Sequence, residues 1–260
     1  MLLGPPSPMG SEILGSRRTS RRSMAWDILL HLMADVAIRL QELQHRVQQA
    51  ALRAGRRPQR VRLLGVAKTA TPEGLQAAWD AGLRDFGHNR IQALEEHQKV
   101  LPEACWHVIG PLQSNKIRRA LEVAACLQSL SELRLGKRLA RVLEEQGRQD
   151  FPCLIQVNLQ PEDGRHGCPA DQVRPLIEQL AALPQLKVAG LMTLGPHRAS
   201  EKTLRQHFAT LNRLAETLVS QSLLPPDPEI SMGMTEDFEW AVEEGATLVR
   251  IGRALFPPQN

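Results

Sequence analysis

The sequence predicts a single α/β domain: a closed (β/α)8 barrel of the TIM type with one extra helix at its N-terminal side. Three observations predict it. From residue 61 onward, eight short aliphatic runs alternate with stretches of helical periodicity. The length of 260 residues is close to the roughly 250 residues of a single barrel. No Gly-x-Gly-x-x-Gly turn follows the first run, as it would in the competing open, doubly wound sheet.

The composition is that of an ordinary globular chain. Hydrophobic residues make up 42% and charged residues 23%, which argues against disorder of the whole chain. No run of 18 apolar residues occurs, so no membrane span is expected. The four cysteines lie far apart, which favours reduced thiols in a cytoplasmic protein, and neither they nor the histidines show metal-binding spacing. We therefore expect no metal, and the net charge of +4 gives no reason to expect nucleic-acid binding.

The chain divides into a short extension and one folded body. Residues 1–24 are rich in Pro, Gly, Ser and Arg without a hydrophobic period, which predicts a disordered extension. Residues 25–260 form the barrel domain, because no proline-rich linker divides them. Within it, residues 27–54 have apolar side chains at helical spacing and predict one long amphipathic helix that ends at Gly55.

The alternating pattern gives each later element a range. The expected strands are 61–67, 84–87, 106–109, 126–130, 153–158, 187–192, 229–232 and 247–251. The expected helices between them are 72–82, 89–99, 114–123, 131–147, 169–183, 201–221 and 235–244. Alternation of this kind indicates a parallel sheet, whose active face lies at the carboxyl ends of the strands.

The first strand ends on Lys68. A lysine at a strand end either extends into solvent or points into a pocket, where desolvation lowers its pKa and the neutral amine can form a Schiff base with a carbonyl. The last two strands end on glycine turns at Ser231-Met232-Gly233 and Ile251-Gly252-Arg253. Barrels commonly bind phosphate in these two loops, and Thr235 could cap a helix that starts at Glu236.

Strand eight closes onto strand one, so the lysine and the two turns are expected to be neighbours. Pyridoxal 5′-phosphate (PLP) carries both an aldehyde and a phosphate and would bridge them. Arg250 would then face the pyridine nitrogen and keep it unprotonated, unless it forms an ordinary ion pair at the strand end.

Six segments resemble the pyridoxal phosphate homeostasis proteins, single-domain relatives of the alanine racemase barrel. They are Gly65–Thr69, Phe86–Arg90, Trp106–Lys116, Gly190–Met192, Ser231–Met234 and Val249–Gly252. The resemblance covers about residues 27–256, in order and without large gaps.

The resemblance implies a role for each matching position. Lys68 would be the lysine bound to PLP, with Asn89 beside the cofactor and Arg250 at the pyridine nitrogen. The phosphate would be bound by Ser231, Gly233, Gly252 and the backbone of Arg253. The family is regarded as buffering or delivering PLP, without a firm catalytic reaction.

Three positions depart from the family. His88 stands where a glutamate is usual, so any role of that acid is in doubt. Arg165-His166-Gly167 replaces a segment that usually carries a lysine, which keeps a positive charge but removes a second amine. The lysine-rich C-terminal tail of some members is missing, because the chain ends in Pro-Pro-Gln-Asn.

Three functions follow from these residues. The first is a monomeric PLP carrier in PLP homeostasis, with apo PLP-dependent enzymes as partners. The second is a racemase-like PLP enzyme, which the absence of any tyrosine disfavours, because racemases of this barrel type use a tyrosine as the second base. His88, His107 or His166 would have to replace it, although local hydrogen bonding or exposure is the simpler expectation for each. The third is a Schiff-base aldolase that uses Lys68 without a cofactor.

Overall fold

The computed structural model describes residues 1, 21–160 and 166–258, and the side chains of its first helix from residue 33 onward. Most of the predicted extension, residues 2–20, lies outside the described residues, as do Arg165 and residues 259–260. Among the described residues, no helix is both long enough and apolar enough to cross a lipid bilayer.

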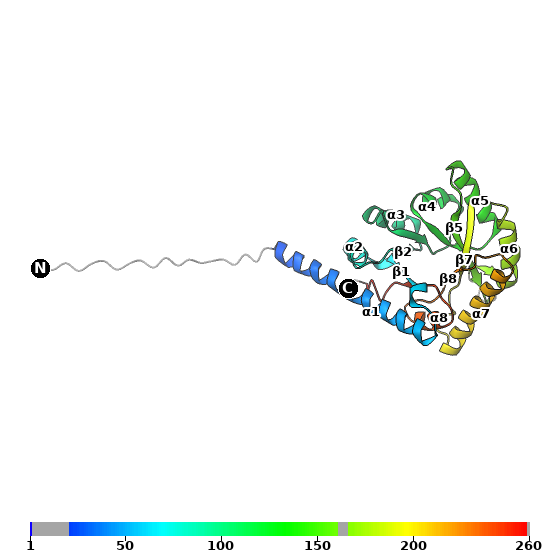
Figure 1. The fold of residues 1–260 in the computed structure, drawn as a ribbon. Coiled ribbons are helices and arrows are strands. Elements are labelled where there is room, and N and C mark those ends of the chain that lie inside the picture. The colour runs from blue at the N-terminus through cyan, green and yellow to red at the C-terminus, as the bar shows by residue number, and fades with distance from the viewer. Residues whose placement is uncertain (2–20, 161–165, 259–260) are drawn as a thin grey trace.

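Eight parallel strands form a closed barrel, which confirms the predicted fold class (Figure 1). The strands run in chain order around the barrel, and the β4–β5 pairing completes the ring. They are β1 (Arg62–Val66), β2 (Asp85–His88), β3 (Cys105–Val108), β4 (Cys126–Leu130), β5 (Phe151–Asn158), β7 (Leu186–Met192), β8 (Glu229–Ser231) and β9 (Leu248–Ile251). Each aliphatic run predicted from the sequence is one of these strands, within two residues at either end.

Helices surround the strands and cover their outer face. They are α1 (Arg21–Arg53), α2 (Pro72–Asp80), α3 (Ile91–Val100), α4 (Ile117–Val123), α5 (Leu133–Glu145), α6 (Val173–Leu180), α7 (Glu201–Ser220) and α8 (Phe238–Glu243). Short 3-10 turns follow β1 at Ala67–Thr69, precede α4 at Ser114–Lys116 and precede α6 at Ala170–Gln172. Residues near the helix ends explain where the helices begin. At the start of α2, the Thr71 hydroxyl accepts a hydrogen bond from the Gly74 amide at 3.1 Å, and Pro72 is the first helical residue.

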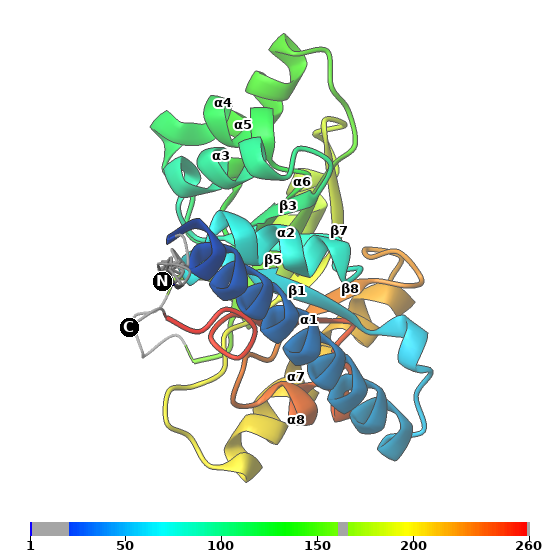
Figure 2. The same cartoon turned by 90° about the vertical axis from the view of Figure 1, so that its left-hand side faces the viewer.

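The extra helix α1 lies diagonally across the outside of the barrel against α2 and α8 (Figure 2). Val36, Leu40, Leu43 and Val47 are buried at spacings of three and four residues, so one stripe of the helix faces the body. The helix ends where predicted: Gly55 takes the left-handed conformation with φ of +66°, and its amide donates to Leu52 O at 3.0 Å. Beyond it, Arg56 donates to the carbonyls of Ala246 at 2.8 Å and of Gly245 at 3.2 Å. These bonds join the end of α1 to the turn after α8.

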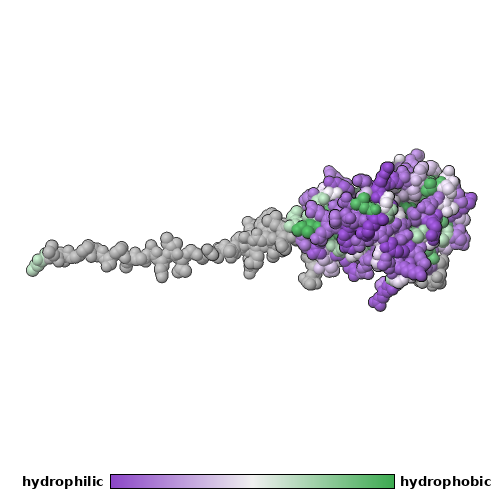
Figure 3. All heavy atoms as spheres, turned by 60° about the horizontal axis from the view of Figure 1, so that its bottom comes forward, coloured by the Kyte–Doolittle hydropathy of each residue, from purple (hydrophilic) through white to green (hydrophobic). Residues whose placement is uncertain are grey.

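The main hydrophobic core is the layer between the strands and the helices. Phe86, Trp106, Val249 and Ile251 belong to it and point outward from their strands. The alternate residues point into the barrel, and many of these are polar. Asp85, His107, Gln128, Gln156, Ser231 and Arg250 are all buried there. The outer surface in the view of Figure 3 is mainly hydrophilic, with hydrophobic side chains in small separate spots.

Three details differ from the sequence prediction. A short strand, β6 (Cys168–Pro169), pairs with β5 at Val157 and was not expected. Helix α1 begins at Arg21, inside the predicted extension 1–24. Thr235 does not cap α8, because a turn occupies residues 235–237 and the helix begins only at Phe238.

Candidate functional site

Lys68 lies on the 3-10 turn that directly follows β1. Ala67 is buried and anchors the turn, whereas Lys68 is exposed at the rim of the barrel. The next residue ties the turn to the end of the chain, because the Thr69 hydroxyl donates to Phe256 O at 2.7 Å. The lysine backbone is therefore held in place while its amine remains accessible.

The turn after β9 lies beside the lysine turn. Strands β1 and β9 are paired with Gly65 opposite Ile251. A Cβ on Gly252 would lie 3.4 Å from Val66 Cβ, an ordinary van der Waals contact, and the chain itself does not require a glycine here. Close approach of a ligand is a physical reason for one.

The turn after β8 requires its glycine. Gly233 has φ of +87°, and a Cβ there would come within 2.5 Å of Ala241 Cβ. Its carbonyl accepts the Arg250 amide at 3.0 Å, which joins this turn to β9. The side chains join the two turns again, because Arg253 pairs with Glu236 at 2.9 Å. The turns that contain Gly233 and Gly252 therefore meet at the same rim as Lys68.

Asp237 shapes the turn where Thr235 was expected to act. Its Oδ1 accepts the Met234 amide at 2.6 Å, and this bond closes the turn before α8 begins. Burial raises the pKa of the Asp237 carboxyl, while the Met234 amide and the positive charge of Arg250 act in the opposite direction. A helix of six residues is too short to provide an anion site at its N-terminus.

Arg250 extends into the mouth of the barrel below these turns. Its side chain is only 3% exposed, and burial lowers its pKa to about 10, so it remains charged at neutral pH. Nη1 donates to Ser231 Oγ at 2.7 Å and Nη2 donates to Thr193 O at 2.8 Å. These bonds use two of the five N–H donors of a guanidinium.

Ser231 lies within the barrel rather than in the turn that follows it. It has no exposed surface, and its hydroxyl donates to Gln128 Oε1 at 2.7 Å while accepting Arg250 Nη1. In this arrangement the serine holds the guanidinium. Its predicted contact with a phosphate stays a prediction.

His88 and Asn89 end β2 on the same rim. Asn89 is exposed, and Gly110 packs so closely on it that a Cβ there would lie 2.6 Å from Asn89 O. His88 is buried, and its Nδ1 accepts the Arg90 amide at 3.0 Å, as expected for a locally bonded histidine. Burial lowers the pKa of His88 to about 4, helped by the positive charges of His97, Arg90 and Lys68. The imidazole of His88 is therefore neutral at physiological pH, and it packs against the ring of His97 on α3.

The structure brings six of the seven predicted site residues to one rim, and places Ser231 just inside it. They are Lys68, Asn89, Gly233, Arg250, Gly252 and Arg253. His166 is exposed and within 3.0 Å of the Ser131 hydroxyl. Sequence reasoning missed Gln128, which holds Ser231, and gave no role to Thr193 at the end of β7, which holds Arg250. The only signal for Gln128 was a polar residue inside the aliphatic run 126–130.

Comparisons with known proteins agree over nearly the whole chain. Residues 38–258 match the family model described as alanine racemase, N-terminal domain. A pyridoxal phosphate homeostasis protein of Aquifex aeolicus is 36% identical over 221 residues, which are 84% of this chain and 96% of the relative. The protein of the same name from Escherichia coli K12 is 33% identical over 233 residues, covering 86% and 97% of the two chains.

Solved structures show the same fold. PipY of Synechococcus elongatus, in a structure with PLP bound, is 34% identical and superposes with a TM-score of 0.72 over 85% of this chain and 99% of PipY. A protein of unknown function from Bifidobacterium adolescentis gives 0.81 at 30% identity, over 87% and 96%. Alanine racemase of Clostridium difficile shares the fold alone, at 10% identity and a TM-score of 0.66, and this chain covers 56% of it. The chain therefore belongs to the pyridoxal phosphate homeostasis proteins, within the family of alanine racemase N-terminal domains.

Proposed function

We propose that this protein binds PLP through a Schiff base with Lys68 and takes part in intracellular PLP homeostasis as a carrier or buffer. Relatives at 33% to 38% identity carry that name, and PipY has been solved with PLP bound. The observation that supports it most is the common rim. The exposed Lys68 follows β1, and the glycine turns after β8 and β9 lie at the same end of the barrel, with β9 paired directly to β1.

The residues at the rim fit the chemical groups of PLP. PLP supplies an aldehyde that a primary amine can attack, and Lys68 is an exposed primary amine. Its phosphate needs backbone amides and positive charge, for which the turns at Gly233 and Gly252–Arg253 are suited. Its pyridine ring has one basic nitrogen, and Arg250 is a buried cation at the barrel mouth.

Arg250 would act on the electronic character of the ring. A guanidinium stays charged and can only donate hydrogen bonds, so it keeps a facing pyridine nitrogen unprotonated. Ser231 and Thr193 fix its orientation. An unprotonated ring is a weaker electron sink, which suits holding PLP better than catalytic turnover.

A racemase-like activity is the alternative. It would need a second base near Lys68, and the sequence contains no tyrosine. His88 ends the strand beside β1, but its Nδ1 already accepts a hydrogen bond from the Arg90 amide, which leaves the ring hydrogen on Nε2. In that tautomer His88 is a donor, so the geometry favours the carrier.

The test of the binding site is borohydride reduction followed by peptide mapping. We expect visible absorbance in the purified protein, which disappears on reduction, and a pyridoxyl group on Lys68 alone. Lys68→Ala should lose the label and retain its fold, because the side chain is exposed. Lys116→Ala, at the turn after β3, is the matched control and should keep it. A pyridoxyl group mapped to any other lysine contradicts the proposed site, and an absence of visible absorbance after PLP addition favours an aldolase without cofactor.

Two assays separate carrier from enzyme. The carrier should transfer PLP to an apo PLP-dependent enzyme. It should restore the activity of that enzyme faster than free PLP at the same concentration does. A steady conversion of L- to D-amino acids that is lost in Lys68→Ala would instead establish the racemase-like alternative.

A further inference from the structure

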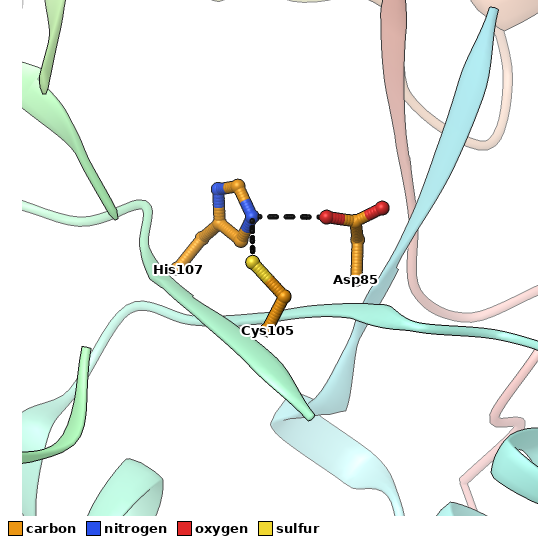
Figure 4. Close-up of side chains that lie close together, drawn as sticks. All are labelled: Asp85, Cys105 and His107. Atoms are coloured by element: carbon orange, nitrogen blue, oxygen red, sulfur yellow. Dashed lines mark hydrogen bonds and ion pairs between the residues drawn. The ribbon is translucent and has the colours of Figure 1, made fainter. Parts of the chain in front are cut away.

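A second cluster of reactive side chains lies at the opposite end of the barrel from Lys68. Asp85 begins β2 and Cys105 begins β3, so both are at the amino-terminal end of the parallel strands. His107 follows two residues after Cys105. Figure 4 shows the imidazole of His107 directed at both the carboxylate and the thiol. Its Nε2 is 3.2 Å from Asp85 Oδ1 and 3.4 Å from Cys105 Sγ.

Strand pairing creates this cluster from residues that look isolated in the sequence. Asp85 is opposite Cys105 in the β2–β3 register, and Gly87 is opposite His107. Alternate residues share one face of a strand, so Cys105 and His107 point the same way. With Asp85 they place one oxygen, one sulfur and one nitrogen atom within 4.8 Å of one another.

The spacing of these atoms suits a tetrahedral metal ion. Bond lengths of about 2.0 Å to oxygen or nitrogen and about 2.3 Å to sulfur imply ligand separations of about 3.3 Å for N···O and about 3.5 Å for N···S. The separations of 3.2 and 3.4 Å in the protein agree with these values. A carboxylate, an imidazole and a thiolate are the ligand types that Zn²⁺ accepts, and three such ligands leave a fourth position open.

The surroundings support the ligands. The amide nitrogen of Gln128 contacts Nδ1 of His107 at 2.9 Å and holds the ring in place. Arg62 links the cluster to Glu229, because it pairs with both Asp85 and Glu229. Oε1 of Glu229 is buried and has no hydrogen-bond partner within the described part of the chain. Its other oxygen pairs with Arg62, so one carboxylate acceptor remains open at this end of the barrel.

Arg62 is the competitor of such an ion. It donates to both oxygens of Asp85, at 2.8 and 3.0 Å. Its second partner Glu229 allows it to stay paired when Asp85 turns toward a metal. Arg62 and Asp85 both line a surface cavity of about 520 Å³ beside the C-terminal part of α1, so the cluster borders solvent on its Asp85 side.

We propose that Asp85, Cys105 and His107 bind a divalent transition-metal ion with the preferences of Zn²⁺. Binding would displace the thiol proton of Cys105 and shift the proton of His107 from Nε2 to Nδ1, where the Gln128 amide, turned over, would accept it through Oε1; water from the cavity would complete the coordination. The site lies at the other end of the barrel from Lys68 and does not depend on PLP.

The test uses Co²⁺ as a spectroscopic probe on the untagged, reduced, full-length protein after chelator treatment. We expect one equivalent to give the intense d–d bands of tetrahedral cobalt and a thiolate-to-cobalt charge-transfer band, both removed by Zn²⁺. Cys105→Ser should abolish the charge-transfer band, and Asp85→Asn should weaken binding about tenfold or more. Arg62→Gln should bind more tightly than the parent, because it removes the competing cation.

Cys168→Ser is the control, since this thiol belongs to the short strand β6 and is not part of the cluster. It should keep both cobalt bands. The proposal is overturned if the parent shows no tetrahedral bands, or if the bands survive Cys105→Ser and vanish in Cys168→Ser. Thermal melts provide a second reading if a variant folds poorly: Zn²⁺ should raise the melting temperature of the parent and of Cys168→Ser, and an unchanged melting temperature in both counts against the site.

Discussion

At the scale of single residues, Arg250 is a charged side chain kept in a buried position by two named acceptors. Ser231 Oγ and Thr193 O each accept one hydrogen bond from the guanidinium. Burial lowers the pKa of Arg250 to about 10. A buried charge without such partners would be costly. The guanidinium is therefore fixed in one orientation at the barrel mouth before any ligand arrives.

Arg250→Gln should weaken the retention of PLP by about tenfold, since charged hydrogen bonds contribute about 1.5–3 kcal/mol. The measurement is PLP remaining per chain after gel filtration over a series of times. Ser231→Ala, which leaves the charge in place, should show a smaller loss. Equal PLP occupancy in Arg250→Gln and the parent would refute the assigned role.

His88 gives a pH dependence whose sign follows from its lowered pKa. An unfolded histidine titrates near 6.5 and the folded one at about 4. Between these values the unfolded chain binds more protons, so the stabilising contribution is complete above pH 6.5 and is lost as the pH falls toward 4. Urea unfolding should show a loss of up to about 1.4 kcal/mol per pH unit from this group. The slope of unfolding free energy against pH should become smaller in His88→Gln and should stay the same in the exposed control His45→Gln.

At the scale of elements, the turn after β8 contains a glycine with a positive φ and neighbouring atoms that leave no room for a Cβ. Gly233 has φ of +87° and faces Ala241, whereas Gly147, in the turn after α5, has φ of +64° with nothing within 4 Å of its Cβ position. Both glycines have a positive φ, and they differ in how closely other atoms surround the Cβ position. They form a matched pair.

Gly147→Ala should cost about 1 kcal/mol for its backbone conformation. Gly233→Ala should cost about 2–4 kcal/mol, because overpacking against Ala241 and Phe238 is added. Urea denaturation of both variants measures the difference. Gly233→Ala should also release PLP faster, as the turn must move, and equal stability of the two variants would show that the turn relaxes freely.

The sequence allowed the fold to be predicted because its strands are short aliphatic runs with helical stretches between them. Lys68 and the turn glycines were found because strand ends and strand order already define the rim. The failure at Thr235 has a local cause: the carboxylate of Asp237 closes the turn instead. His107 was expected to bond locally or to be exposed; it is buried, and besides its local contact with Cys105 it has two distant partners. Its partners Asp85 and Gln128 lie 22 and 21 residues away, and only strand register brings them together.

At the scale of the whole molecule, polar side chains connect the two ends of the barrel through its interior. Arg250 at the mouth contacts Ser231, which contacts Gln128, which contacts His107. His107 contacts Asp85, and Arg62 then joins Asp85 to Glu229. Such a network is favourable only while each member has its partner.

Gln128→Leu should break this network at its centre and leave Ser231 and His107 each with one partner fewer. The expected cost is about 2–4 kcal/mol of unfolding free energy, together with faster PLP loss through a less well-fixed Arg250. Gln156→Leu is the control, since Gln156 is buried in the same interior but donates to His166 O. It should destabilise the protein without changing PLP retention, and identical PLP loss in both variants would argue against a connection between the interior and the rim.

Because β1 pairs with β9, the rim around Lys68 can form only late in the synthesis of the chain. Strand β1 gains its second neighbour only when β9 arrives, and the Lys68 turn is tied down by a bond to Phe256. A growing chain on the ribosome therefore exposes Lys68 long before Gly252 and Arg253 have been translated. The rim that we propose as the vitamin site is completed only when β9 has been made, and chains that terminate before β9 should lack it.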